Sequence, residues 1–357
     1  MNIVVKESKV GATKVKKNVD SALRRYLLAN PSLSDLVQFI FINNRGILAA
    51  DESGGSIAKK FAAMKIEDNE KNRRDYRNIF LSAEGLENYC GGVIMFEETA
   101  AQKADNGQLF GDLLLDKNIL PGIKLDRGLV ELPNFAGETW TRGLDDLAER
   151  LEKYFAMGFR FAKWRAAFQI VGNKLPSATA MDLNTTILAV YASLCQNAGI
   201  VPIVEPEVVH DGDYNIETCA LATTKIIKML MEKLSEYRVD LTGTILKCNM
   251  VLAGKKYVVQ SSSLDVAEAT ISVLKNTVAP KIGAVVFLSG GQTPEQAAKN
   301  FHAIKNLNLS EGVLPFPVSF SFARALQDPA LTAWCGKESN FGVAQKEFVK
   351  QLQRVAE

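Results

Sequence analysis

Short apolar segments rich in β-branched and aromatic residues recur along the chain about every 30–45 residues, and a polar or glycine-containing loop follows each one. Runs of this kind, bounded by turn-forming residues, are typical of buried strands. The predicted strands are residues 46–53, 91–98, 121–126, 158–165, 200–208, 243–250, 282–290 and 315–324.

Helical patterns separate several of these strands, at residues 144–158, 185–199, 219–237 and 264–278. Two of these helical patterns end at a glycine, as helices often do at their C-termini. Strands that alternate with helices predict parallel βα units. Eight such units, in a chain longer than the ~250 residues that the fold typically needs, predict an α/β protein with a (β/α)8 TIM barrel.

The main alternative is a doubly wound open sheet, which normally carries a G-x-G-x-x-G motif after its first strand. The sequence contains neither this motif nor a G-x-x-x-x-G-K-[ST] phosphate loop, so the barrel is favoured. Because no low-complexity linker is present, residues 1–357 are expected to form a single domain. Residues 1–40 would be an N-terminal helical lead-in, and residues 325–357 a C-terminal extension or tail.

Composition limits the classes of partner. The 357 residues are 47% hydrophobic and 23% charged, and the net charge is +2. These values suit a globular protein and give no reason to expect nucleic acid or an anionic membrane as a partner. No apolar run approaches the roughly 18–20 residues of a membrane span. Local positive groups must therefore hold any anionic ligand.

The cysteines and the first residues of the chain indicate the cell compartment in which the protein works. Five scattered cysteines without a C-x-x-C pair favour reduced thiols and a cytoplasmic location. Residues 1–20 lack the apolar region of a secretory signal. They are lysine-rich, and a mobile basic arm is favoured there over a transit peptide.

Histidine is too rare to carry the usual chemistry. Only His210 and His302 occur, so neither a histidine-rich metal site nor a Ser-His-Asp triad is expected. His210 lies in VVHDGDYN, which could form an oxygen-rich metal loop. A polar surface turn after a strand is the favoured interpretation.

Chemically active side chains follow nearly every predicted strand. In a barrel the C-terminal strand ends form the active face, so these side chains should meet in space. Residues two apart also share one strand face. Lys163 and Arg165 can therefore point inward while Trp164 faces the helices, and the same holds for the pairs Glu205 with Glu207 and Lys247 with Asn249.

Lys247 ends the predicted strand GTILKCNM. Burial and neighbouring cations lower the pKa of a lysine, and a neutral amine can condense with a ketone to form an iminium. Nearby carboxylates can transfer protons, while cations and a glycine-rich loop suit phosphate. These residues indicate Schiff-base chemistry on a phosphorylated sugar, with no metal and no other cofactor.

Seven segments carry a resemblance to a known family. They are LAADESGGSIAKKF, GIKLDRG, FAKWR, VPIVEPEV, LKCNM, FLSGGQ and SFSFARALQDPALTAW. In order and spacing, from about residue 30 to about residue 340, they resemble class I fructose-bisphosphate aldolase. The resemblance implies a (β/α)8 barrel, no metal and a homotetramer. It also implies reversible cleavage of fructose 1,6-bisphosphate to dihydroxyacetone phosphate and glyceraldehyde 3-phosphate, in glycolysis and gluconeogenesis.

The resemblance also implies roles for single residues. Lys247 matches the Schiff-base nucleophile, Glu205 the general acid/base, and Glu207 its neighbour. Asp51 matches the carboxylate that orients the substrate hydroxyl and assists carbon–carbon cleavage, and Lys163 a cation beside the substrate. The implied substrate-binding residues are Arg165, then Ser289, Gly290 and Arg324 for the ketone-side phosphate, and Ser53, Ser56 and Lys124 for the aldehyde-side phosphate.

Three departures from the family pattern stand out. Cys248 replaces a proline, and Phe322-Ala323 replaces Tyr-Gly. No tyrosine follows Tyr257, so the C-terminal tyrosine that animal members use in proton exchange has no counterpart. Removal of residues 353–357 should therefore affect turnover less than it does in those relatives.

Two other functions remain open from the sequence. One is a lysine-dependent barrel enzyme for another phosphosugar or a monophosphate; candidates for phosphate contacts at both substrate ends favour the bisphosphate. The other is an inactive barrel that acts as a binding or scaffolding protein. Such a protein would be expected to lose its buried charges, because unused ones cost stability, and here they are retained.

Overall fold

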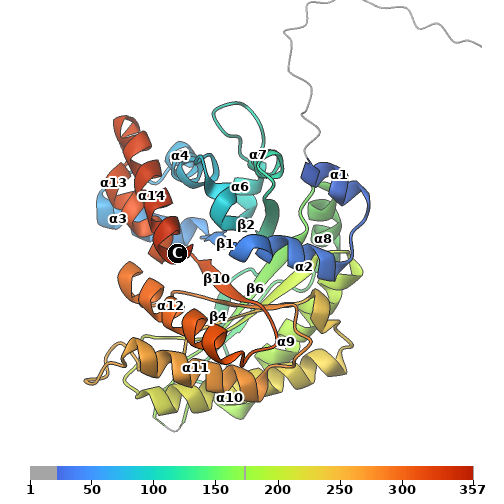
Figure 1. Ribbon diagram of the computed structural model, residues 1–357, viewed down its shortest axis with the longest axis vertical. Coiled ribbons are helices and arrows are strands. Elements are labelled where there is room, and N and C mark those ends of the chain that lie inside the picture. The colour runs from blue at the N-terminus through green and yellow to red at the C-terminus, as the bar shows by residue number, and fades with distance from the viewer. Residues whose placement is uncertain (1–21, 173, 357) are drawn as a thin grey trace, which may run out of the picture.

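A computed structural model describes residues 22–172 and 174–356 of the chain. Within these residues, eight parallel strands close into a barrel in chain order, and β10 pairs with β1 (Figure 1). The strands are β1 (Gly46–Ala50), β2 (Cys90–Met95), β3 (Leu120–Lys124), β6 (Phe161–Phe168), β7 (Val201–Val208), β8 (Ile245–Cys248), β9 (Ala284–Phe287) and β10 (Val318–Phe322). The predicted TIM barrel is confirmed, and closure excludes the open sheet.

On most of the barrel strands, neighbouring apolar residues belong alternately to two separate cores. The inner core includes Ile245 on β8 and Phe161 on β6. The outer core, between the strands and the helices, includes Leu246 and Cys248. Because side chains alternate between the faces of a strand, Lys247 shares the inward face of Ile245.

The ring of Phe161 fills much of the barrel interior near two glycines. A Cβ atom on Gly122 would lie 2.2 Å from this ring, and one on Gly92 would lie 2.9 Å from it. There is no space for a methyl group at either position, so Gly92 on β2 and Gly122 on β3 make room for the aromatic ring.

Helices cover the barrel between successive strands. They include α8 (Leu147–Ala156), α9 (Ala178–Asn197), α10 (Ile216–Glu236), α11 (Ser263–Thr277) and α12 (Pro294–Glu311). The sequence placed the middle of the first four correctly, but α9 begins well before residue 185. Ser177 caps it by accepting a hydrogen bond from the backbone N–H of Ala180.

The sequence analysis did not predict the bounds of several elements in the first half of the chain. A short antiparallel hairpin, β4 (Leu129–Glu131) and β5 (Thr139–Thr141), lies between β3 and β6. The remaining elements there are the helices α3 (Gly54–Met64), α4 (Glu70–Leu81), α5 (Leu86–Tyr89), α6 (Glu97–Ala101) and α7 (Phe110–Asp116).

Helices also flank the barrel in the chain. Helices α1 (Ala22–Leu28) and α2 (Leu33–Phe41) precede β1, and α2 inserts apolar side chains into the inner core. After β10 come α13 (Arg324–Trp334) and α14 (Phe341–Ala356), and α14 packs against α4 (Figure 1). Three single turns of 3-10 helix complete the elements, at Ile42–Asn44, Leu241–Gly243 and Glu338–Asn340. The predicted basic arm at residues 1–20 lies outside the described residues.

Candidate active site

A compact charge cluster occupies the inside of the barrel at the C-terminal strand ends. Lys247 Nζ lies 3.1 Å from Glu205 Oε1, and the other carboxylate oxygen of Glu205 lies 3.2 Å from Lys163 Nζ. Lys163 Nζ is also 2.8 Å from Asp51 Oδ2 and 3.8 Å from Asp126 Oδ2. Strands β1, β3, β6, β7 and β8 thus bring four predicted site residues together with Asp126.

The two lysines of this cluster differ in their surroundings. Burial alone would lower the pKa of Lys163, but Asp51, Glu205 and Asp126 outweigh it and raise that pKa. Lys163 is therefore a fixed cation. Within the described residues Lys247 has one ion-pair partner, Glu205. Of the two lysines, Lys247 is the predicted nucleophile.

Asp51 is held in its ionised form. Burial would raise the pKa of its carboxyl, but the positive charges of Lys163, Lys247 and Lys124 outweigh burial and lower that pKa to about 2. An ionised carboxylate here can accept a hydrogen bond or a proton from a substrate hydroxyl.

Farther out, Arg165 and Glu207 form an ion pair across β6 and β7, with Arg165 Nε 2.5 Å from Glu207 Oε2. Both side chains line a cavity of about 500 Å³ together with Gly290 and Arg324. A Cβ atom on Gly290 would lie 3.2 Å from Glu207 Oε1 and 3.9 Å from Arg324 Nη2, so this glycine lets the backbone approach both groups. Ser289, next in the chain, is buried.

The predicted aldehyde-side residues are less closely grouped. Lys124 Nζ contacts Asp126 twice, at 2.6 Å from Oδ1 and 2.7 Å from the carbonyl oxygen. Ser53 and Ser56 lie together at the start of α3, with their hydroxyl oxygens 3.3 Å apart. Among the described residues, no hydrogen bond joins either serine to Lys124.

The sequence analysis missed three residues of the site. Asp126 was seen at a strand end but received no role, although it contacts both Lys124 and Lys163. His210 and Lys255 line the 500 Å³ cavity. His210 lies in a bend after β7, as predicted, and is half-buried. Lys255 lies in a long loop after β8, and nothing in the sequence pattern marked it.

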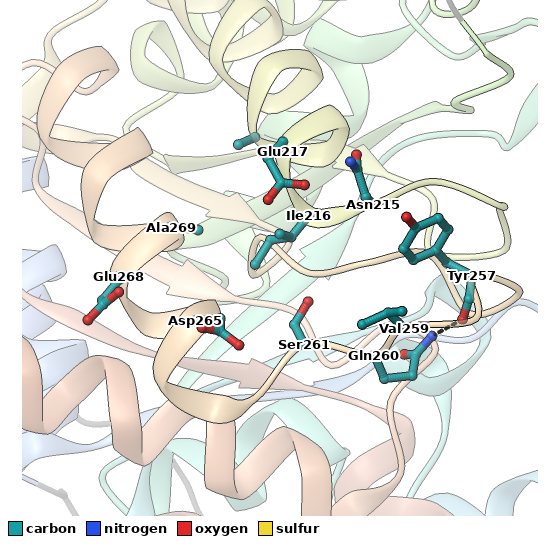
Figure 2. A pocket seen from close by; sticks show the side chains of 11 residues that line it. Asn215, Ile216, Glu217, Tyr257, Val259, Gln260, Ser261, Asp265, Glu268 and Ala269 are labelled. Atoms are coloured by element: carbon teal, nitrogen blue, oxygen red, sulfur yellow. Dashed lines mark hydrogen bonds between the residues drawn. The ribbon is translucent and has the colours of Figure 1, made fainter.

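A second cavity, of about 570 Å³, lies outside the barrel between the start of α10 and the start of α11 (Figure 2). Glu217, Asp265 and Glu268 line it, and no lysine or arginine is among its lining residues within the described chain. No predicted site residue reaches it. Because it presents carboxylates without cations, it is unsuited to an anionic sugar phosphate.

No cluster of His, Cys, Asp and Glu side chains that could hold a metal ion is found in residues 22–172 and 174–356. No helix in that part of the chain is long and apolar enough to cross a membrane. Its five cysteines are free thiols, and four of them are buried. Burial raises the pKa of the Cys248 thiol to about 12, which keeps that thiol protonated.

A closed barrel with a lysine–carboxylate cluster at its C-terminal end, and beside it a cavity that two arginines and a lysine line together with three carboxylates, defines a lysine-based barrel enzyme. The family model for fructose-bisphosphate aldolase class-I matches residues 32–357. The chain belongs to this family, as the sequence motifs predicted, and it is a lyase.

Relatives of known identity agree with this assignment. Fructose-bisphosphate aldolase C-B of Danio rerio is 45% identical over 322 residues, which cover 90% of this chain and 88% of that one. Fructose-bisphosphate aldolase 4, cytosolic, of Arabidopsis thaliana is 44% identical over 338 residues, 94% of this chain and 84% of that one. The fructose-bisphosphate aldolase of Plasmodium falciparum, solved with TRAP and a small-molecule inhibitor, superposes with a TM-score of 0.88. It is 40% identical and covers 91% of this chain and 92% of its own.

Proposed function

We propose that the Lys247 cluster carries the reaction of this family, the reversible cleavage of fructose 1,6-bisphosphate to dihydroxyacetone phosphate and glyceraldehyde 3-phosphate through a lysine Schiff base. The observation that carries the proposal is the 3.1 Å contact between Lys247 Nζ and Glu205 Oε1, beside a second lysine whose positive charge is fixed. It pairs an amine nucleophile with a proton-transfer group at the active end of the barrel.

In the proposed reaction, the neutral amine of Lys247 adds to the C2 ketone of the substrate, and Glu205 supplies the proton with which the carbinolamine oxygen leaves as water. The iminium then draws the electrons of the C3–C4 bond. Asp51 accepts the proton of the C4 hydroxyl as that bond breaks, which releases the aldehyde and leaves an enamine. Protonation at C3 and hydrolysis free the ketone product and restore Lys247.

The remaining predicted residues are assigned to substrate binding. Ser289, Gly290 and Arg324 would hold the ketone-side phosphate; the cavity lined by Gly290 and Arg324 supports this assignment. Ser53, Ser56 and Lys124 would hold the aldehyde-side phosphate. Lys163 and Arg165 would supply positive charge along the sugar, and Glu207 would orient Arg165 through their ion pair.

Borohydride trapping tests the nucleophile. The protein is incubated with fructose 1,6-bisphosphate and EDTA, reduced, digested and mapped by mass spectrometry. A triose phosphate adduct on Lys247 is expected, because a reduced Schiff base is a stable amine. Lys247→Met should abolish the adduct. Lys163→Met, the matched control, should retain an adduct on Lys247. An adduct on Lys163 or Lys124 would overturn the assignment of the nucleophile.

Three wider features belong to the same proposal. The chain would act as one domain, assemble as a homotetramer and work in the cytosol. Family membership supports the tetramer. The free cysteines and the cytosolic relative from Arabidopsis support the compartment.

A further inference from the structure

His210 lies at the edge of the 500 Å³ cavity that is assigned above to the ketone-side phosphate. It follows β7 in the loop that leads to α10. The backbone N–H groups of Gly212 and Lys255 both donate to its carbonyl oxygen, at 2.8 and 2.9 Å. The loop after β8 therefore holds His210 in place from the other side.

The imidazole packs directly onto the glycine loop of the phosphate site. A Cβ atom on Gly291 would lie 2.2 Å from His210 Cδ2, and the φ of Gly291 is +77°. Both facts make glycine the residue that fits at position 291. The ring thus lies against the Ser289–Gly291 segment, and its Nδ1 is buried without a hydrogen-bond partner among the described residues. An unpaired buried nitrogen of this kind is a candidate for a ligand contact.

The fixed charges of the cavity cancel one another. Three cationic and three carboxylate side chains line it: Arg165, Lys255, Arg324, Glu207, Asp211 and Asp328. A phosphoryl group near pH 7 adds between one and a half and two negative charges, roughly, because its second pKa is about 6. A ligand phosphate therefore brings negative charge that the fixed groups do not neutralise.

In the free protein the imidazole of His210 is the uncharged titratable group of this cavity. Burial lowers the pKa of its imidazole below the usual value. Asp211 acts in the opposite direction, while Lys255 and Arg324 lower the pKa further. A phosphate dianion within about 4–6 Å would favour the imidazolium form instead.

We propose that His210 is a further substrate-binding residue, which takes up a proton from solvent when the ketone-side phosphate occupies the cavity and so favours the dianionic phosphate. This inference rests on the proposed function of the Ser289–Gly291 and Arg324 site. No covalent bond forms or breaks at His210; one proton passes from water to the imidazole on binding and returns on release.

The histidine count makes a direct test possible. Because the chain has only His210 and His302, its NMR spectrum contains one Hε1 signal from each imidazole, and His210→Asn assigns them. Saturation with dihydroxyacetone phosphate should raise the titration midpoint of His210 by about one pH unit, equivalent to a tenfold difference in affinity between its two protonation states. The midpoint of His302, on α12 with Nε2 3.1 Å from the carbonyl oxygen of Val355, should not move.

Steady-state kinetics give a second readout. His210→Asn should raise KM for fructose 1,6-bisphosphate roughly threefold to tenfold more at pH 6 than at pH 8, with a smaller change in kcat. A merely structural role would raise KM equally at both pH values. His302→Asn is the matched control and should leave both parameters unchanged.

Borohydride trapping of dihydroxyacetone phosphate in the same sample separates the two proposals. An adduct on Lys247 with an unmoved His210 midpoint would overturn the role of His210 and leave the proposed function standing. Absence of both the adduct and the shift would overturn both. An adduct together with the shift supports both.

Discussion

At the scale of single residues, the two buried lysines of the site, Lys163 and Lys247, differ in the carboxylates around them. Lys163 forms ion pairs with Asp51, Asp126 and Glu205, whereas among the described residues Lys247 forms one with Glu205 alone. Three carboxylate partners hold a lysine in its charged form. This difference in ion-pair partners supports the nucleophile role of Lys247.

Asp51 should give the protein a specific weakness in acid. Its folded-state pKa of about 2 lies below the usual value of 3.8, so its contribution to stability is fully present above about pH 4 and is lost as pH falls towards 2. The contribution is on the order of 2 kcal/mol. The urea midpoint of the wild type should therefore fall more between pH 5 and pH 3 than that of Asp51→Asn. Equal falls would contradict this account of Asp51.

Sequence reasoning reached most of the charged cluster but not all of it. The two-residue period was enough to place Lys163, Glu205 and Lys247 on inward strand faces. The contact of Asp126 with Lys163 depends on the distance between β3 and β6, which no pattern along one strand specifies. His210 depends on how the loop after β7 folds against Gly291. Loop conformations of this kind are not encoded by hydrophobic periodicity.

At the scale of elements, the buried strands were predicted well. Each is a run rich in β-branched residues, and turn-forming residues mark where it ends. Asn72-Arg73-Arg74 was interpreted as a helix face, but the extent of α4 was not predicted, because its first half, Glu70–Asp75, is entirely polar. The hairpin β4–β5 was missed because each strand has only three residues. Elements that are short, or whose first turns are entirely polar, carry too little periodic signal.

We expect the last helix turn to matter for stability and not for the reaction. Val355 on α14 is buried, and Arg354 pairs with Glu295 of α12 at 2.7 Å. Deletion of residues 353–357 should lower the melting temperature by a few degrees, because it exposes apolar surface equivalent to about 1.5–3 kcal/mol. Turnover should stay close to that of the full chain.

Val355→Ala separates packing from chain length in this test, and it should lower the melting temperature without changing kcat. A collapse of kcat in the truncated protein, with its circular dichroism unchanged, would show that the C-terminal residues take part in the reaction.

At the scale of the whole molecule, the net charge of +2 cannot collect anionic substrates by a long-range field. Cations are instead placed locally: Arg165, Lys255 and Arg324 line one cavity, where three carboxylates balance their charge. The cavity in Figure 2, by contrast, is lined by carboxylates without cations. Local placement, not overall charge, therefore selects where a sugar phosphate binds.

The proposed assembly gives a prediction at the same scale. Sedimentation equilibrium should report four times the chain mass of 39.1 kDa. Replacement of Leu221 and Leu264 by aspartate should shift the mass towards smaller species if these exposed side chains are covered in the tetramer, because a buried unpaired carboxylate is costly. A single-chain mass for the wild type at micromolar concentration would refute the tetramer.

The packing of Phe161 against Gly122 limits how the sequence can change in evolution. Phe161 lies so close to Gly122 that alanine cannot replace that glycine while the ring remains. Loss of the ring first would leave a cavity costing about 3–5 kcal/mol, a large part of the roughly 5–15 kcal/mol that holds a protein folded. Whichever of the two residues is replaced first, the single substitution gives a destabilised protein. Descendants of this chain should therefore keep the glycine and the phenylalanine together or exchange them together, so that positions 122 and 161 evolve as one unit.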